Sequence, residues 1–299
     1  SKNETVYNFK LPKPNHFIPK NVKIPNRDIK ENLKPSLIVK NKGTNIYFGK
    51  DHEFLRPKGV ISYKILFPKN KITLKHRAFL KIYIECVRES MNELGYPAKL
   101  AGLSYSIFDG YEGVYLNVNG YTESAINLYT IMLDHMGKIK ISDEKFLAIK
   151  DKIIRGYKNI PLSDAYQQAR EKNAEIYHNV KFNWDDLAPV AESATMEKIK
   201  TFAKDLFSQV SIEGFVYGDF EESDARKTLR LFKEKTGYRS INRSEAFELE
   251  YLNQEEPEKV QLVDFLEVNN SCFWREYQIG YDAPELRAQA IIIGKDGKK

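Results

Sequence analysis

Histidines are the first residues to test for chemistry, because two of them on one helix face could hold a catalytic metal ion. The chain has five, His16, His52, His76, His135 and His178. None belongs to a His-x-x-Glu-His or His-Glu-x-x-His arrangement, since His52-Glu53 leads into a Phe-Leu-Arg run. His76 and His135 lie near expected helix ends, which is typical of exposed or capping histidines. A zinc site needs three converging protein ligands, so the sequence predicts no metal site in this chain.

Nucleophile and phosphate-binding patterns are missing as well. No Gly-x-Ser-x-Gly elbow occurs, and Cys272 has no neighbouring histidine in the sequence. The segment 110–113, Gly-Tyr-Glu-Gly, lacks the Lys and Ser/Thr of a P-loop, and its glycines are typical of turns. Asp185 and Asp186 are adjacent, so their side chains point differently and fit a helix start. The residues alone therefore indicate no catalytic machinery.

The surrounding pattern predicts the elements that would position any site. β-Branched and aromatic segments at 36–48 and 60–67 predict strands, and apolar residues at helical spacing predict a helix over 74–94. That helix is expected to end at Gly95, with Pro97 just beyond. Alternating segments on either side of Asp109-Gly110 predict a β-hairpin.

The second half of the chain is expected to be mainly helical and to close with strands. Helices are expected from Thr122, from Ser142, over 163–177 and from Thr195, followed by a strand at 210–218 and a helix over 221–235 that ends at Gly237. Further strands are expected at 246–252, 259–268 and 271–279, before a helix at 284–293. This order indicates an α+β fold, with an antiparallel sheet packed against helices.

Charge is concentrated at the start of the sequence. Residues 1–40 carry nine basic and three acidic side chains, which accounts for the whole net charge of +6. This leader holds five prolines and no arginine cluster, so a solvated linker is favoured over a nucleic-acid-binding face. No apolar run approaches the roughly 18 residues that span a bilayer, and residues 1–5 lack the apolar core of a signal peptide. We expect neither nucleic acid nor membrane as a partner.

Two segments resemble a known family. Residues 11–21, LPKPNHFIPKN, resemble the Leu-Pro-x-x-Asn-x-Phe-Ile-Pro-x-Asn signature of the insulinase/pitrilysin zinc metallopeptidases. Residues 98–121, from AKLAGLSYSI to VYLNVNGY, are similar to that family's Ala-x-Leu-Ala-Gly-Leu-x-Tyr hairpin and its closing Gly-Tyr. Weaker similarities follow at 212–220 and 269–278, so the resemblance runs in order through nearly the whole chain.

The resemblance implies a position within a longer enzyme. Family members have four homologous α+β domains around a chamber, and the first holds zinc through His-x-x-Glu-His and a downstream glutamate. This chain aligns with the middle, which implies a linker and the end of a preceding domain over 1–58. It also implies a central α+β domain over 59–255 and the start of a following, truncated domain over 256–299. The catalytic motif is absent, so no zinc is expected in this chain, although zinc is expected in the intact enzyme.

The expected function follows from that position. The resemblance implies a non-catalytic middle region of a zinc metalloendopeptidase that degrades peptides, forming part of the substrate chamber wall and inactive alone. The inward surface would be the sheet or the hairpin, where tyrosines offer apolar area and a hydroxyl for gripping a peptide. Those residues are Tyr105, Tyr111, Tyr115 and Tyr121. Ordinary packing is the alternative role for them, because strands are rich in aromatic residues.

Two further hypotheses stay open. The chain could be a free-standing peptide-binding or scaffold protein of the same fold, which partners a separate catalytic subunit. Nucleic-acid binding through the basic leader is the third and weakest hypothesis. Ser1 is not a methionine start, and residues 294–299 interrupt the last expected helix, so we expect a fragment whose partner is the remainder of the peptidase.

Overall fold

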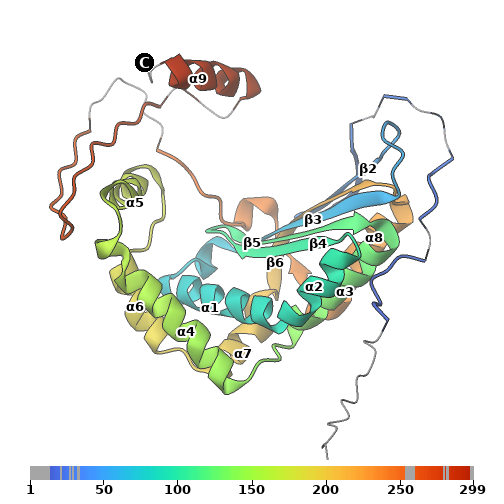
Figure 1. Cartoon of the computed structure of the whole chain (residues 1–299), viewed down its shortest axis with the longest axis horizontal. Helices are drawn as coiled ribbons and strands as arrows, with labels where there is room; N and C mark the ends of the chain where they lie inside the picture. The colour runs from blue at the N-terminus through green and yellow to red at the C-terminus, as the bar shows by residue number, and fades with distance from the viewer. Residues whose placement is uncertain are drawn as a thin grey trace, which may run out of the picture. The chain divides into compact units, whose positions relative to one another are not determined.

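The computed structural model describes residues 14–20, 22–26, 28, 30–31, 34–252, 260–278, 280 and 283–296 (Figure 1). The chain divides into two compact units. The first takes in the described residues up to Tyr157 together with Trp184–Glu248, and the second takes in Lys158–Asn183 and the described residues from Leu249 onward. The first unit contains the sheet and is the part that positions a candidate site.

One sheet organises the first unit. Its described strands are β1 (Ser36–Asn41), β2 (Thr44–Lys50), β3 (Lys58–Leu66), β4 (Ser104–Asp109), β5 (Gly113–Tyr121), β6 (Gln209–Gly218) and the short β7 (Arg239–Ser240). The strand order is β1-β2-β6-β3-β5-β4, and β7 pairs with β6.

The α+β prediction is confirmed, but the sheet is mixed and not wholly antiparallel. β6 lies between β2 and β3, runs parallel to β2 and antiparallel to β3, and is also parallel to β7. Strands on both sides of residue 58 therefore belong to one sheet. The domain boundaries expected at about 58 and 255 stay predictions.

The predicted hairpin is present, because β4 and β5 pair from Ser104↔Asn119 to Asp109↔Val114. The amide of Gly110 donates to the Gly113 carbonyl across 2.8 Å and closes the turn. Gly113 must be glycine, since a Cβ there would lie 1.8 Å from the carbonyl oxygen of Ile65 in β3.

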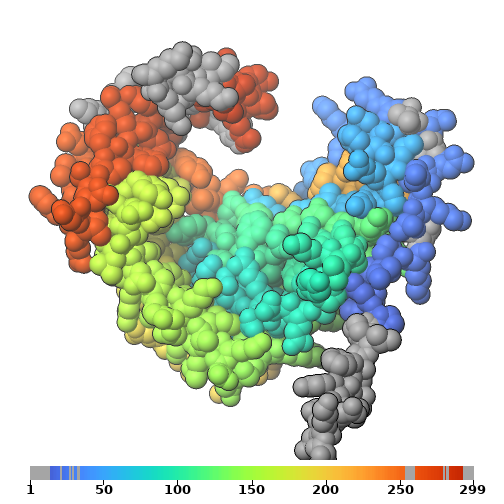
Figure 2. All heavy atoms as spheres, in the orientation of Figure 1, coloured from blue at the N-terminus to red at the C-terminus, as the bar shows by residue number. Residues whose placement is uncertain are grey.

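Helices cover one face of this sheet. They are α1 (Leu74–Ser90), α2 (Asn92–Leu100), α3 (Thr122–Gly137), α4 (Asp143–Lys158), α6 (Trp184–Glu192), α7 (Met196–Leu206) and α8 (Glu222–Thr236). α1, α2, α3 and α8 contact the strands directly. Figure 2 shows the atoms of α1, α2 and α3, coloured cyan to green, as a continuous surface.

The buried side of the sheet supplies the core. Ile61, Tyr63 and Ile65 alternate along β3 and are at most 1% exposed. Val114, Leu116 and Val118 do the same along β5. Period-two alternation places these residues on the helix-facing side, and burying large apolar side chains of this kind contributes about 1.5–3 kcal/mol each. Cys86 of α1 is also a core residue, and burial raises the pKa of its thiol to about 12.

Several expected helix boundaries are confirmed. Thr195 caps α7 by accepting the Lys198 amide, and α8 ends at Gly237 in the left-handed conformation, with φ of 64°. The single helix expected over 74–94 is wrong, because α1 ends at Ser90 and α2 continues through Gly95 and Pro97. Thr122 is the first residue of α3 and not its cap, since the capping position is Tyr121.

The leader is less solvated than expected. Phe17 is fully buried, and the Asn15 side-chain amide donates to the Pro97 carbonyl of α2 across 2.8 Å. The Lys20 amide donates to Glu123 at the start of α3. The signature segment is therefore attached to the helical side of the first unit. Its residues 11–13 and 21 lie outside the described residues.

The second unit contains α5 (Ala165–Tyr177) and α9 (Pro284–Asp296). The strand predicted at 246–252 is wrong, because the chain there makes only isolated bridges, Pro68↔Ala246 in the first unit and His178↔Tyr251 in the second. No strand forms over residues 260–278 either, so the predictions at 259–268 and 271–279 fail where the structure describes them. A strand needs a hydrogen-bonding partner, and large side chains in this segment, such as Phe265 at 94% exposure, are unburied.

Candidate functional site

The sheet face that points away from the helices is the candidate site, and we call it the open face. The strand register gives this face three rows of side chains, each crossing β5, β3 and β6 in that order. The three rows are Asn119–Val60–Tyr217, Asn117–Ser62–Phe215 and Tyr115–Lys64–Glu213. Every one of these nine side chains is half-buried or exposed, whereas their neighbours along each strand point into the core. Among the described helices of the first unit, none packs over this face.

Uncharged polar side chains line one half of the open face. Ser62 donates to the Asn117 side-chain oxygen across 2.7 Å, and the Asn117 amide donates to Ser106 across 3.3 Å. Asn119 and Ser104 lie 3.5 Å apart in the same arrangement. Side-chain amides and hydroxyls both donate and accept hydrogen bonds. This half of the open face can therefore hydrogen-bond to the N–H and C=O groups of a peptide.

Aromatic rings line the half of the open face formed by β2 and β6, and a further pair lies at one end of β4 and β5. Phe215 and Tyr217 of β6 stack with their ring centroids 6.0 Å apart, and Tyr47 of β2 is paired with Phe215. At the far end of β4 and β5, Phe108 and Tyr115 stack at 4.8 Å. Stacked rings of this kind present large, rigid apolar surfaces at little entropic cost.

An ionic cluster closes one end of the open face. The Lys64 ammonium lies 2.7 Å from the Glu112 carboxylate, which also accepts a 2.9 Å hydrogen bond from the Tyr115 hydroxyl. Burial and the bond to Glu112 raise the pKa of Tyr115 well above its ordinary value, so this tyrosine stays protonated. Arg243 pairs with Glu213 at 3.3 Å. Each cation in this cluster is therefore paired with a carboxylate, and the ion pairs fix the side chains at this end of the open face.

Two of the four predicted tyrosines lie on opposite faces of the hairpin. Tyr115 lies on the open face against Phe108. Tyr105 of β4 points to the helical side, where its hydroxyl donates to the Met91 carbonyl across 3.2 Å and burial raises its pKa. Tyr105 therefore packs the hairpin onto the α1–α2 junction.

The other two tyrosines lie at the ends of the hairpin. Tyr111 is in the turn, with its ring centroid 4.7 Å from the Arg77 guanidinium. Tyr121 ends β5, with its ring centroid 4.8 Å from the Lys58 ammonium. The structure thus does not bring the four tyrosines together, and their contact with substrate stays a prediction. Phe215, Tyr217 and Asn117 are not singled out from the sequence, although a spacing of two places Phe215 and Tyr217 on one face of β6 and Asn117 and Asn119 on one face of β5.

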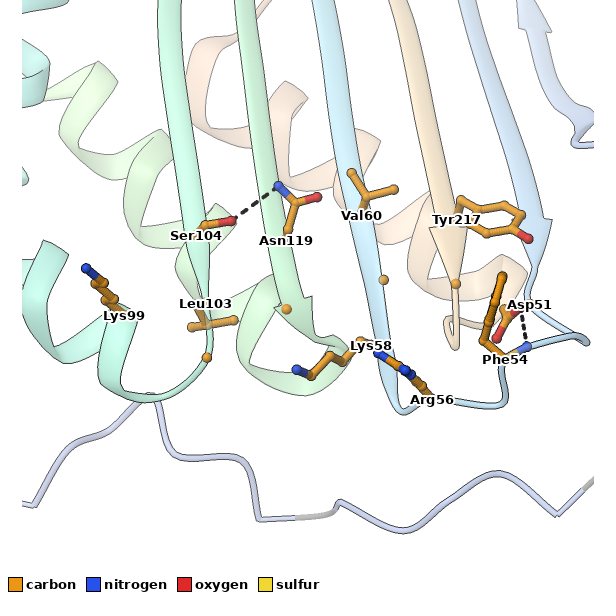
Figure 3. Close-up of a pocket in the computed structure, with 14 residues that line it drawn as sticks. Asp51, Phe54, Arg56, Lys58, Val60, Lys99, Leu103, Ser104, Asn119 and Tyr217 are labelled. Atoms are coloured by element: carbon orange, nitrogen blue, oxygen red, sulfur yellow. Dashed lines mark hydrogen bonds between the residues drawn. The ribbon is translucent and has the colours of Figure 1, made fainter.

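A hollow of about 640 Å³ lies at the opposite end of the open face from the ionic cluster. Figure 3 shows Ser104, Asn119, Val60 and Tyr217 side by side on adjacent strands above it. Its remaining lining comes from the strand ends, from the loop before β3 and from the end of α2. It includes Phe54 and the cationic residues Arg56, Lys58 and Lys99.

Three glycines in register form the floor at this end of the sheet. Gly59 of β3 is paired with Gly120 of β5 on one side and Gly218 of β6 on the other. A Cβ on Gly59 would lie 2.5 Å from the ring of Phe220, which is fully buried beneath it. Glycine is required because the three backbones approach closely over that ring.

The histidines make no catalytic arrangement. The described residues contain no group of three or more His, Cys, Asp or Glu side chains that could hold a metal ion. His76, expected to be exposed or capping, instead packs edge-on against Phe67 and Phe202 with ring centroids 4.8 and 5.3 Å away. His135 lies at the end of α3 as expected and contacts Ser90 across 2.9 Å. Within the described residues, no helix has the length and apolar character of a membrane span.

Comparison with known proteins identifies the family. Residues 1–190 match the family described as the middle or third domain of peptidase M16. The chain belongs to the M16 family of peptidases, the family of insulinase and pitrilysin. The resemblance stated from residues 11–21 and 98–121 is thereby confirmed. The chain is a middle region of such peptidases.

The relatives of this M16 chain are much longer. It is 27% identical over 226 residues to the insulin-degrading enzyme of Bos taurus, an alignment that covers 76% of this chain and 22% of that enzyme. A Schizosaccharomyces pombe protein with zinc protease in its name is 24% identical over 220 residues, covering 73% of this chain and 23% of that protein. The chain thus spans about a fifth of the length of the curated relatives it matches.

Solved M16 structures share the fold. A crystal structure of pitrilysin superposes with a TM-score of 0.68 at 21% identity, over 77% of this chain and 24% of that one. An M16 inactive domain from Pseudomonas fluorescens superposes with a TM-score of 0.52 at 11% identity, over 70% of this chain and 52% of that one. At these identities the likeness concerns the fold.

Proposed function

We propose that this chain is the non-catalytic middle region of an insulinase-like zinc metalloendopeptidase, and that its open face forms part of the wall of the peptide-binding chamber. The observation that carries the proposal is the open face itself: uncharged amides, hydroxyls and stacked rings lie on a surface that no described helix of the first unit covers. Such a surface suits an extended peptide, which needs both backbone hydrogen bonds and apolar contact.

Zinc and the bond-breaking chemistry belong to another part of the peptidase in this proposal. The described residues hold no metal-binding group, and the relatives whose names state a protease are several times longer than this chain. The partners are therefore the remainder of the peptidase chain and its peptide substrates. The tyrosine that contacts peptide in this arrangement is Tyr115, with Tyr105, Tyr111 and Tyr121 supporting the hairpin from its other face and its ends.

A free-standing peptide-binding or scaffold protein, which partners a separate catalytic subunit, is the second candidate. The fold shared with the Pseudomonas fluorescens domain supports it, because the same fold occurs there in a domain named as inactive. Both candidates predict the same open-face binding and differ in whether the catalytic domain is on the same polypeptide. An antibody to this chain distinguishes them by the size of the native protein that it detects.

Peptide binding by the open face is tested with paired variants. Phe215→Ala with Tyr217→Ala removes the stacked pair on β6, and we expect peptide affinity to fall about tenfold for loss of two aromatic contacts. Tyr96→Ala with Leu100→Ala removes two exposed apolar residues of α2 and is the control. Equal affinity in both double variants, measured by fluorescence anisotropy with labelled peptides, would refute the open-face assignment.

A further inference from the structure

The hollow at the glycine end of the sheet is lined by three cationic side chains. Arg56 precedes β3, Lys58 begins it, and Lys99 lies in the last turn of α2. All three side chains are exposed. Within the part of the chain that the structure describes, none of them forms an ion pair with an acidic side chain. The Lys58 ammonium lies 4.8 Å from the centroid of the Tyr121 ring and keeps its positive charge in that contact.

The acidic side chain in the lining has a structural role. Asp51 is 5% exposed and accepts hydrogen bonds from the amides of Glu53 and Phe54, both at 3.2 Å. It therefore holds the turn that presents Phe54 and Arg56 at the rim, as Figure 3 shows. Its carboxylate is engaged within that turn, and the three cations line the same hollow.

The rest of the lining favours a peptide over a polyphosphate or a nucleic acid. Val60, Leu103 and the ring of Phe54 are apolar, and Ser104 and Asn119 are uncharged. Three cations on two segments, residues 56–58 and the end of α2, suit a single carboxylate better than a string of phosphates, which requires a longer row of basic residues. The lining is also continuous with the open face, because Asn119, Val60 and Tyr217 form one register row of it.

We propose that this hollow binds a carboxylate of a peptide lying along the open face, through Arg56, Lys58 and Lys99. This inference rests on the proposed function and adds a chemical preference to it. The carboxylate can be an acidic side chain or the C-terminal carboxylate of the peptide, because both present the same two oxygens to the cations. The hydrophobic lining accommodates the residues next to that group.

The test uses the whole chain and three short labelled peptides of Val, Ser and Phe. One has a Glu and an amidated C-terminus, the second has Gln and a free C-terminus, and the third has Gln and an amidated C-terminus. We expect the chain to bind one or both carboxylate peptides about fivefold more tightly than the neutral one at low salt, as exposed charge contacts provide. The first two peptides distinguish the two sources of carboxylate.

Matched charge variants locate the effect. Arg56→Gln with Lys99→Gln should abolish the preference for the carboxylate peptides over the neutral peptide. Lys200→Gln with Lys227→Gln removes the same charge from exposed positions of α7 and α8 and should preserve the preference. Circular dichroism confirms that each variant is folded.

The other outcomes overturn the inference in distinguishable ways. If all three peptides bind equally, or if both charge variants lose the preference alike, the hollow is not the carboxylate site but the proposed function stands. If no peptide binds, the proposed function fails as well. If inorganic triphosphate binds, is lost in Arg56→Gln with Lys99→Gln, and no carboxylate preference appears, the ligand is a polyphosphate and the peptide assignment is wrong.

Discussion

The Nε of Arg88 in α1 donates a 2.8 Å hydrogen bond to the carbonyl oxygen of Ile107 in β4. β4 is one edge of the described sheet, and the other edge has an equivalent contact, because Arg226 of α8 donates to the Ile38 carbonyl of β1 across 2.9 Å. An unpaired edge strand offers its backbone groups to any other strand. Each helix thus covers one edge carbonyl with an arginine.

Removing both edge contacts should promote association between copies of the chain. In Arg88→Ala with Arg226→Ala, the freed carbonyls can pair with another strand, so we expect a larger dimer fraction at equal concentration, measured by light scattering after size-exclusion chromatography. Arg155→Ala is the control, because Arg155 is an exposed helical arginine that pairs with Asp151 on its own helix. An unchanged mass for the double variant would show that these arginines do not protect the edges.

Gly218→Ala should destabilise the first unit strongly. Gly218 has φ of 123°, and a Cβ there would lie 2.4 Å from both the Gly59 Cα and the Lys58 carbonyl oxygen. Strain of this kind together with a backbone clash costs about 2–4 kcal/mol of unfolding free energy. Urea denaturation followed by circular dichroism measures it.

The matched control for that substitution is Gly156→Ala. Gly156 lies in α4, and a Cβ added to it would have no other atom within 4 Å. Alanine is therefore accommodated there and should stabilise the helix by about 0.5–1 kcal/mol. Similar effects of the two substitutions would contradict the close backbone approach at the end of the sheet.

His76 should make stability depend on pH. Burial, followed by the charges of Lys71 and Arg77, lowers its pKa from 6.5 to about 4. Below pH 6.5 His76 is therefore protonated in the unfolded chain but stays neutral in the folded chain. The free energy of unfolding falls as the pH drops from 6.5 to 4. We expect this group to contribute a loss of about 1–3 kcal/mol over that window.

His76→Phe isolates this contribution, because phenylalanine keeps the edge-on contacts with Phe67 and Phe202 and does not titrate. Unfolding free energies from urea titrations at several values between about pH 7 and pH 4 should fall less steeply in the variant than in the parent chain. Parallel curves would mean that His76 is not held neutral in the folded state.

The purified chain should neither bind zinc stoichiometrically nor cleave peptides. This expectation follows from the lack of a metal-binding group among the described residues. Metal analysis after dialysis against zinc, and peptide hydrolysis with and without a chelator, test it. Stoichiometric zinc together with cleavage that the chelator stops would refute the proposed non-catalytic role.

Elements with local signals could be predicted from the sequence. The Thr195 cap and the Gly237 terminator depend on residues within one helical turn, and the β4–β5 hairpin depends on adjacent segments around Asp109-Gly110. The break between α1 and α2 depends on tertiary contacts instead. The Met91 carbonyl at that break accepts the hydroxyl of Tyr105 from β4, and Asn15 of the leader binds the Pro97 carbonyl.

The candidate site shows the same division. Which strand face each residue occupies follows from period-two alternation, so the placement of Asn117 and Asn119 together was readable from β5 alone. Joining them to Phe215 and Tyr217 required β6 to insert between β2 and β3, and several helices separate β6 from β5 along the chain. Contacts across so long a segment have no signal in the adjacent residues.

The sequence by itself determined the family, the α+β class, the local turns and caps, and the lack of a metal-ligand motif. Each of these features depends on residues that are close together in the chain. The tertiary structure decided that the sheet is mixed, that the helices of the first unit leave one face open, and that Arg56, Lys58 and Lys99 line one hollow. The physical reason is that a strand's hydrogen bonds do not specify which partner strand it takes. That choice depends on the packing of the whole core.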